Sequence, residues 1–286
     1  MLEGIHKIHL IGIGGSGMRA IANILIQKGY EVSGSDVKES DVIERFRQMG
    51  ATVHIGHNAD YVQGVDAVVR STAIREDNPE IVAAKEQGIT ILHRSDIVKA
   101  VLDVTNGIAV AGAHGKTSTT SMIGQILVEG QMEPTVIIGG EVDYLKGSSC
   151  LGKGEYSVVE ADESDGSFLK LRPKTIVITN IEDDHMDHYK TMENLLNAFC
   201  QFVETLPVDG KAVVCGDNDN IRYVMSKVER QFITYGLEES NDYVAKNIHY
   251  EDSSLVYDVV RKGETLSRVS LRVPGNHNVL NSLASF

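Results

Sequence analysis

The sequence predicts an α/β protein of two domains, each built on a largely parallel sheet. Apolar segments of strand length alternate with helical segments along most of the chain, and two glycine-rich loops each follow such a strand directly. Near residue 243 the alternation changes to consecutive short strands, which predicts a small antiparallel sheet attached to the second domain. With 286 residues, 42% of them hydrophobic, the chain can bury the cores of about two domains.

The first domain is expected over residues 1–104 as a doubly wound, Rossmann-like sheet. Its predicted strands and helices follow in the order strand 9–11, helix 18–28, strand 31–33, helix 41–49 and strands 51–53, 67–69 and 89–92. Strands that alternate with helices in this way indicate a parallel sheet covered by helices.

The second domain is expected over residues 105–286. Its predicted elements are strand 107–111, helix 118–129, strands 157–159 and 175–178, helix 192–205, strand 211–215 and the antiparallel strands of 243–273. The last residues, 278–286, have helical apolar spacing without a capping glycine, so we expect the chain to stop where a helix would continue.

Composition excludes several classes of protein. The formal net charge of −13 argues against a nucleic-acid partner, because binding to phosphate backbones needs a basic surface. There is no apolar run of about 18 residues and no signal-peptide core, so we expect no membrane segment and a cytoplasmic location. Three cysteines without C-x-x-C spacing indicate neither a disulfide framework nor a zinc site.

The first glycine loop, Gly12-Ile13-Gly14-Gly15-Ser16-Gly17, matches G-x-G-x-x-G, and Asp36 ends the second strand at the spacing of a ribose-binding acid. The pattern predicts a diphosphate-containing ligand on a helix N-terminus. NAD and UDP-sugars satisfy it equally, and a purely structural turn would use the same glycines.

The second loop, Gly112-Ala113-His114-Gly115-Lys116-Thr117, follows the apolar strand 107–111 and predicts a P-loop ATPase-type domain. Backbone N–H groups would close on phosphate oxygens, Lys116 would add a positive charge, and the Thr117 hydroxyl could join a Mg²⁺ shell. The loop is shorter than the common P-loop pattern, and a tight strand-to-helix turn is the alternative.

Three further polar segments follow predicted elements. The acidic segment 160–165 follows one predicted core strand, and segment 179–188, which includes His185, follows another. These positions favour a Mg²⁺ site with one imidazole ligand over a zinc site. A solvated acidic loop is the alternative. Segment 274–281 starts the last helix with amide and imidazole groups suited to a purine edge, although a capped helix start would look the same.

Together with Ser71-Thr72-Ala73-Ile74, these segments and their order resemble the Mur ligase family, and within it the members that add L-alanine to UDP-N-acetylmuramate. The resemblance covers nearly the whole chain. It implies an N-terminal domain for UDP-N-acetylmuramate, a central ATPase domain, and a C-terminal domain that is absent here, so the chain alone is expected to be inactive. An NAD-dependent oxidoreductase and a binding module without turnover are the alternatives from other classes.

The resemblance also implies roles for individual residues. Lys116, Glu160 and His185 would be catalytic, and Thr117, Glu160 and His185 would hold Mg²⁺. The residues implied to bind ATP are Gly112, Ala113, His114, Gly115, Lys116, Thr117, Ser118, His277 and Asn281. Those implied to bind the UDP-sugar are Gly14, Gly15, Ser16, Gly17, Asp36, Ser71 and Thr72.

The implied reaction is an ATP-dependent amide ligation with two small-molecule substrates, UDP-N-acetylmuramate and L-alanine. The lactyl carboxylate attacks the γ-phosphate of ATP, and the alanine amine then attacks the acyl phosphate. A family member that attaches a whole peptide to the same sugar shares these domains and is the nearest alternative.

Overall fold

The computed structural model describes all 286 residues and divides into two compact units. Unit 1 comprises Met1–Val104 and Glu133–Gly154, and unit 2 comprises Thr105–Met132 and Glu155–Phe286. The predicted α/β class holds for both. The domain prediction assigned all of 105–286 to the second domain, whereas Glu133–Gly154 groups with the first unit.

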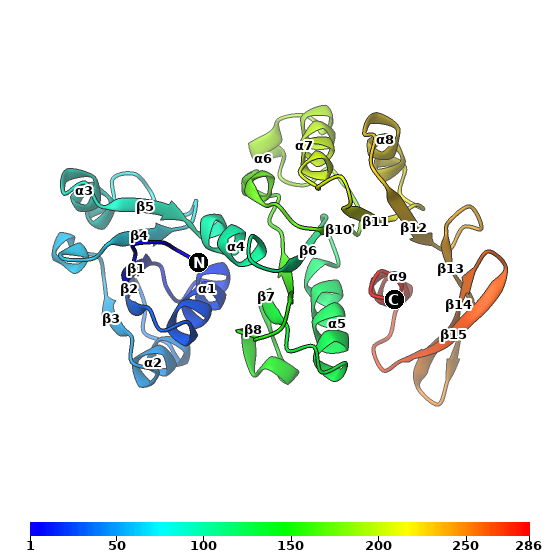
Figure 1. Ribbon diagram of the computed structural model, residues 1–286, viewed down its shortest axis with the longest axis horizontal. Coiled ribbons are helices and arrows are strands. Elements are labelled where there is room, and N and C mark those ends of the chain that lie inside the picture. The colour runs from blue at the N-terminus through cyan, green and yellow to red at the C-terminus, as the bar shows by residue number, and fades with distance from the viewer. The chain divides into compact units, whose positions relative to one another are not determined.

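Unit 1 contains a five-stranded parallel sheet in the order β3-β2-β1-β4-β5. Its strands are β1 (Lys7–Ile11), β2 (Glu31–Asp36), β3 (Thr52–Ile55), β4 (Ala67–Arg70) and β5 (Thr90–His93). Its helices are α1 (Ser16–Gln27), α2 (Asp41–Gln48), the 3-10 turn η1 (Ala59–Val62), α3 (Pro79–Glu86) and α4 (Arg94–Leu102). The order reverses beside β1, so right-handed crossovers place α1 and α2 on one face and α3 on the other (Figure 1).

A hairpin from later in the chain completes unit 1. It consists of β7 (Thr135–Val142), η2 (Asp143–Leu145) and β8 (Gly147–Cys150), with the two strands antiparallel. The hairpin packs on α1: Asn23 Nδ2 donates to the Ser149 carbonyl at 2.9 Å, and Ser149 Oγ donates to the Ala20 carbonyl at 2.9 Å. These contacts explain why this segment groups with unit 1.

Unit 2 is built on a mixed sheet whose strands follow in the order β15-β14-β13-β12-β11-β10-β6-β9. The parallel strands are β6 (Asn106–Ala111), β9 (Tyr156–Glu160), β10 (Thr175–Ile178), β11 (Lys211–Cys215) and β12 (Phe232–Gly236). The helices are α5 (Lys116–Glu129), η3 (Ser167–Lys170), α6 (Met186–Tyr189), α7 (Met192–Glu204) and α8 (Asp219–Lys227). In Figure 1, α7 and α8 lie on one side of β10–β12 and α5 lies on the other.

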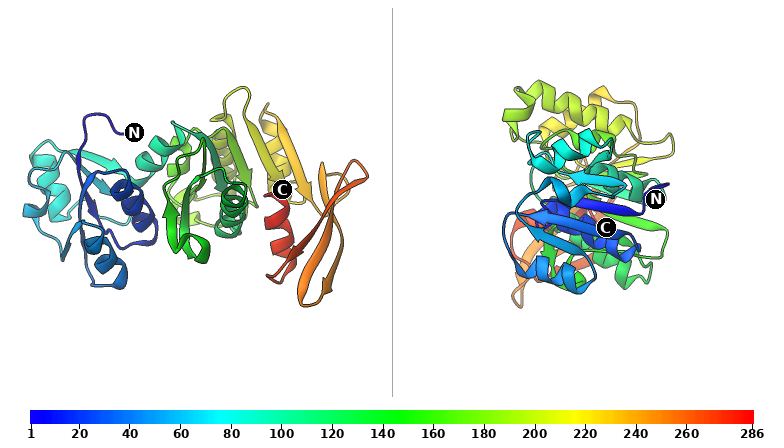
Figure 2. Two further views of the ribbon diagram at one scale, coloured as in Figure 1. Left: turned by 60° about the horizontal axis from the view of Figure 1, so that its bottom comes forward. Right: turned by 90° about the vertical axis from the view of Figure 1, so that its left-hand side faces the viewer.

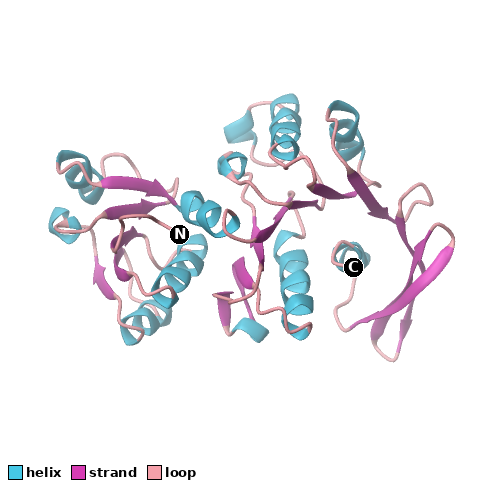
Figure 3. Cartoon of the chain, viewed as in Figure 1, coloured by secondary structure: helices cyan, strands magenta, loops and turns pink.

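The antiparallel part consists of β13 (Tyr243–Glu251), β14 (Ser254–Arg261) and β15 (Glu264–Leu271), which Figure 3 shows as hairpins without an intervening helix. These strands extend the main sheet, since β13 pairs in parallel with β12, and do not form a separate small sheet. The last helix, α9 (Asn276–Leu283), packs beside β13 and β14 (Figure 2).

Each unit has its own apolar core. In unit 1, Ile11, Val68 and Ile81 join β1, β4 and α3 in one buried cluster. In unit 2, Phe168 of η3 packs on Phe199 and Phe202 of α7, with ring centroids 5.3 and 4.6 Å apart. None of the helices combines the length and the apolar sequence needed to cross a membrane.

Candidate active site

The predicted phosphate loop connects β6 to α5. Gly115 caps the helix with φ +83°, and Gly112 has φ +132°, both in the region that side chains other than glycine rarely adopt. A Cβ atom at Gly112 would clash with Thr179, and one at Gly115 would clash with Asn281. Both glycines are therefore needed for the shape of the loop.

The loop is held from the neighbouring strand. Thr179 and Asn180 follow β10, and the Asn180 side chain bonds His114 twice: Oδ1 accepts from the His114 amide at 2.8 Å, and Nδ2 donates to the His114 carbonyl at 2.9 Å. Thr179 Oγ1 donates to the same carbonyl at 2.6 Å. These bonds attach the predicted phosphate loop to the segment that follows β10.

Lys116 is the first residue of α5 and pairs with a buried carboxylate. Its Nζ donates to the Gly112 carbonyl at 2.5 Å and to Glu163 Oε1 at 2.6 Å. The Glu163 side chain is only 2% exposed, and its Oε2 is buried without a hydrogen-bond partner. Burial raises the pKa of Glu163, although the charge of Lys116 opposes this shift.

Thr117 and Glu160, two of the three residues implied to hold Mg²⁺, also lie together. Thr117 Oγ1 donates to Glu160 Oε1 and Oε2 at 3.1 and 3.2 Å. Glu160 is the last residue of β9, next to β6 in the sheet, so both side chains stand at the carboxyl edge where α/β proteins bind ligands.

His185 lies near Glu163. Its Nε2 is 3.5 Å from Glu163 Oε1 and 3.6 Å from Asp184 Oδ2, and its backbone has φ +58°. The side chains show no ready-made cluster of three or more histidine, cysteine or acidic ligands. The adjacent oxygen atoms of Thr117 and Glu160 are nevertheless of the kind that Mg²⁺ prefers as ligands.

Helix α9 brings Asn281 to the phosphate loop. The Asn281 Oδ1 atom accepts from Thr119 Oγ1 of α5 at 3.4 Å, and the side chain closes on Gly115. His277 lies one turn earlier, beside Gly275. Asn281 thus adjoins the loop, while an adenine-binding role for either residue stays a prediction.

The residues predicted to bind the UDP-sugar lie at the carboxyl edge of the unit 1 sheet. Asp36 Oδ2 accepts from the Gly14 amide at 2.9 Å, so this carboxylate holds the glycine loop closed. Ser71 and Thr72 follow β4, and Thr72 Oγ1 is 3.1 Å from His93 Nε2. Groups at or just after the ends of β1, β2, β4 and β5 thus lie at one edge of the sheet.

Matches to two protein-family models show which family the chain belongs to. Residues 7–104 match the catalytic domain of the Mur ligase family, and residues 110–286 match the Mur ligase middle domain. The chain belongs to the Mur ligase family. The resemblance seen in the motifs is therefore confirmed.

Individual Mur ligases resemble the chain over its whole length. The UDP-N-acetylmuramate–L-alanine ligase of Desulfatibacillum aliphaticivorans is 44% identical over 280 residues, which cover 98% of this chain and 61% of that protein. The chain thus spans less than two thirds of the length of such relatives.

Two solved Mur ligase structures share the fold closely. A UDP-N-acetylmuramate–alanine ligase from Thermotoga maritima has a TM-score of 0.87 and 31% identity, covering 98% of this chain and 63% of that one. A UDP-N-acetylmuramate:L-alanyl-γ-D-glutamyl-meso-diaminopimelate ligase from Neisseria meningitides has a TM-score of 0.91 and 27% identity, covering 99% and 92%.

The sequence did not single out two residues that the Mur ligase structure places at these sites. Glu163 lay within the predicted acidic segment, but nothing in the pattern marked it as the partner of Lys116. Arg94 begins α4 and reaches the first glycine loop, where its Nη1 lies 2.8 Å from the position a Cβ atom of Gly17 would take. Its position directly after the end of a strand was the available signal.

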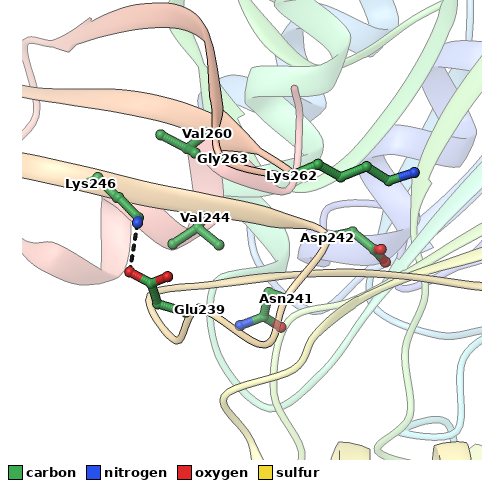
Figure 4. A pocket seen from close by; sticks show the side chains of 8 residues that line it. All are labelled: Glu239, Asn241, Asp242, Val244, Lys246, Val260, Lys262 and Gly263. Atoms are coloured by element: carbon green, nitrogen blue, oxygen red, sulfur yellow. Dashed lines mark hydrogen bonds and ion pairs between the residues drawn. The ribbon is translucent and has the colours of Figure 1, made fainter.

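A pocket of about 260 Å³ lies elsewhere in unit 2 of this Mur ligase (Figure 4). Lys246 Nζ donates to Glu239 Oε1 at 2.6 Å across it. The lining residues are Glu239, Asn241, Asp242, Val244, Lys246, Val260, Lys262 and Gly263. None of the predicted site residues lines this pocket.

Proposed function

We propose that the chain carries the nucleotide-binding parts of an ATP-dependent ligase that joins the lactyl carboxylate of UDP-N-acetylmuramate to L-alanine in peptidoglycan precursor synthesis. The observation that carries the proposal is the glycine loop between β6 and α5, with Lys116 and the Thr117–Glu160 pair at one sheet edge. Relatives over 40% identical across the chain bear the name of this ligase, which supports the choice of substrates.

In this proposal unit 2 binds ATP. The amides of Gly112 to Ser118 surround the phosphates, and Lys116 exchanges its bond with Glu163 for one with the β- and γ-phosphates. Asn281 and His277 would face the adenine. Thr117 and Glu160 would hold Mg²⁺, with His185 beside them, and the ion would supply charge that offsets the phosphates.

Unit 1 would bind the UDP-sugar. The amides of Gly14, Gly15, Ser16 and Gly17 at the start of α1 suit the diphosphate, and Asp36 suits the ribose. Ser71 and Thr72 would lie near the sugar.

The chemistry follows from bringing two anions together. A carboxylate is a poor acyl donor, so its oxygen attacks the γ-phosphorus, the bond to ADP breaks, and an acyl phosphate forms. The alanine amine then attacks the acyl carbon, phosphate leaves with the bonding electrons, and the amine loses a proton. Lys116 lowers the barrier to the first step because it offsets the charge of the phosphates.

Isothermal titration calorimetry of the 286-residue chain tests the binding part of the proposal. We expect heat on titration with UDP-N-acetylmuramate and with ATP, and none with NAD. Binding of NAD alone would overturn the proposal and support an oxidoreductase. Binding of neither UDP-N-acetylmuramate nor ATP would also count against it.

The structural match to the peptide ligase favours a second candidate, attachment of a whole peptide to the same sugar. Both reactions use UDP-N-acetylmuramate, so calorimetry with the sugar nucleotide alone does not separate them. A turnover assay does separate them, made on a protein of the relatives' full length because this chain alone is expected to be inactive. L-Alanine is supplied in one series and L-alanyl-γ-D-glutamyl-meso-diaminopimelate in another. Phosphate release with this tripeptide alone would replace our first proposal with the second.

A further inference from the structure

Glu80 is a carboxylate buried in the core of unit 1. It is the second residue of α3, and its side chain is 0% exposed. Acidic side chains are rarely buried unless they are paired and hydrogen bonded, because removal from water disfavours the charge. The partners of Glu80 therefore indicate what its burial achieves.

Both carboxylate oxygens are bonded to segments that end at the carboxyl edge of the sheet. Glu80 Oε2 accepts from Ser35 Oγ of β2 at 2.7 Å and lies 3.4 Å from His9 Nε2 of β1. Glu80 Oε1 accepts from the Asn58 amide at 3.3 Å and lies 3.2 Å from His57 Nδ1, in the loop after β3. One side chain thus connects β1, β2 and the loop that follows β3.

These segments shape the first glycine loop. The Ser35 carbonyl accepts from the amides of Gly12 and Ile13 at 2.8 and 3.1 Å. The next residue, Asp36, accepts from Gly14 through its side chain and from the Gly56 amide through its carbonyl. Ser35 therefore joins the buried carboxylate to the backbone that turns into the loop.

Bonding keeps the carboxyl group of Glu80 ionised. Burial alone would raise its pKa, but hydrogen bonds from His9, Ser35 and His57 and the charge of His9 outweigh burial and leave the pKa below its usual value. Charge-assisted hydrogen bonds are among the stronger ones, so replacing this carboxylate weakens the connection to Ser35.

We propose that Glu80 is a positioning residue for sugar-nucleotide binding: through Ser35 and His57 it holds the end of β2 and the turn of the first glycine loop in the shape that receives the diphosphate. The inference rests on the proposed function of unit 1. Glu80 does not itself reach the ligand, since it is fully buried behind β2.

The variant Glu80→Gln tests the proposal, because it keeps the size of the side chain and replaces one acceptor oxygen with an NH₂ donor. Glu76→Gln is the matched control: Glu76 lies in the same segment, is 62% exposed and pairs with Arg70 and Lys85, so it loses the same charge without touching β2. We expect Glu80→Gln to weaken binding of UDP-N-acetylmuramate about tenfold or more by calorimetry. ATP affinity should stay unchanged in both variants.

Amide hydrogen exchange of Gly12 and Ile13, measured by NMR without ligand, provides a second readout. Both amides should exchange faster in Glu80→Gln than in the wild type or in Glu76→Gln, because their acceptor Ser35 is less firmly held. Unchanged exchange together with unchanged sugar-nucleotide affinity would reduce Glu80 to a structural residue, even if the thermal midpoint falls.

The two proposals fail in distinguishable ways. If the wild type does not bind UDP-N-acetylmuramate, the proposed function of unit 1 fails, and amide exchange still decides whether Glu80 positions the loop. If Glu80→Gln does not fold, Ser35→Ala removes the bond from Ser35 Oγ to Glu80 together with the 3.2 Å contact of the same oxygen with His57 Nδ1, and it should give a smaller change of the same sign in both readouts. Wild-type behaviour of Ser35→Ala would then overturn the proposal.

Discussion

At the residue scale, the pair of Lys116 and Glu163 combines a stability requirement with a binding requirement. Lys116 is the counter-ion of a carboxylate that is almost fully buried, and the same amine is the group proposed to meet ATP. The phosphates of ATP can replace Glu163 as the partner of Lys116 only if the carboxylate keeps another source of neutralisation. Glu163 Oε2 is unpartnered, and Oε1 of the same carboxylate lies 3.5 Å from His185 Nε2, so a cation bound at the proposed metal site is a suitable source.

Replacing Lys116 should therefore change both properties. In Lys116→Met we expect ATP affinity to fall about 100-fold, because a charged phosphate donor is lost, and UDP-N-acetylmuramate affinity to stay unchanged. The free energy of unfolding should fall by about 3 kcal/mol because Glu163 loses its counter-ion. Calorimetry and urea denaturation measure the two effects.

Adding Glu163→Gln to Lys116→Met separates the loss of stability from the loss of ATP affinity. The double variant Lys116→Met, Glu163→Gln should recover stability but not ATP binding, because it removes the unpaired charge and leaves the phosphate donor absent. Lys211→Met, at an exposed lysine of the same unit, controls for net charge. Normal ATP affinity in Lys116→Met would contradict the assigned role.

Gly115 allows backbone strain to be distinguished from a clash at the site. Gly115 and Gly29 have similar φ values, +83° and +85°, but a Cβ atom at Gly29 meets nothing within 4 Å, whereas one at Gly115 meets Asn281. Gly29→Ala should cost about 1 kcal/mol of unfolding free energy from conformation alone. Gly115→Ala should cost more and also weaken ATP binding. Equal stability losses with intact ATP binding in both variants would show that the contact with Asn281 is unimportant.

At the scale of elements, local sequence patterns predicted where strands lie better than which other elements they pack against. Each glycine loop was placed correctly between its strand and helix, because glycines that directly follow an apolar strand are typical of a tight turn into a helix. The hairpin of β7 and β8 was missed. Its strands belong to unit 1 because they contact α1, which lies more than a hundred residues earlier in the chain. Local sequence patterns do not predict contacts over such a separation.

The short helix η3 connects the acidic loop to the core of unit 2. Phe168 packs on Phe199 and Phe202, and its amide donates to the Asp162 carbonyl at 3.2 Å. Packing of one aromatic ring therefore anchors the segment that carries Glu160 and Glu163.

Phe168→Leu should loosen that segment. We expect a loss of about 1 kcal/mol in unfolding free energy and a measurable decrease in ATP affinity, because Glu163 no longer has a fixed position. Phe46→Leu is the matched control: Phe46 is equally buried, but it lies in α2 of unit 1. It should lose similar stability with ATP affinity intact. The same ATP affinity in both variants would indicate that the core does not position the acidic loop.

At the scale of the whole molecule, the sequence predicted the parallel part of both sheets and the edge at which the predicted site residues lie. It could do so because parallel strands end at a common edge, so residues just after strands meet there whatever their distance along the chain. It could not predict which charges pair. Glu160 and Glu163 lie at and just after the end of β9, yet one bonds Thr117 and the other Lys116, a difference set by side-chain packing.

Acid unfolding provides a last test that involves the whole chain. The pKa of Glu80 in the folded state lies below its usual value of 4.5, so the ionised carboxylate stabilises the fold. This contribution is complete above the unfolded pKa and is lost as the pH falls through the lower folded pKa. The groups that face Glu80 are His9 of β1, Ser35 of β2 and His57 of the loop after β3, and His54 of β3 also interacts with its charge. Wild type and Glu80→Gln should therefore differ in unfolding free energy by about 2 kcal/mol at pH 7, and this difference should shrink as the pH falls through the folded pKa of Glu80. Urea denaturation at pH 7 and at a series of lower pH values measures this difference in unfolding free energy, with Glu76→Gln as the charge-matched control. A gap that stays constant over this range would mean that Glu80 acts through its shape and not through its charge.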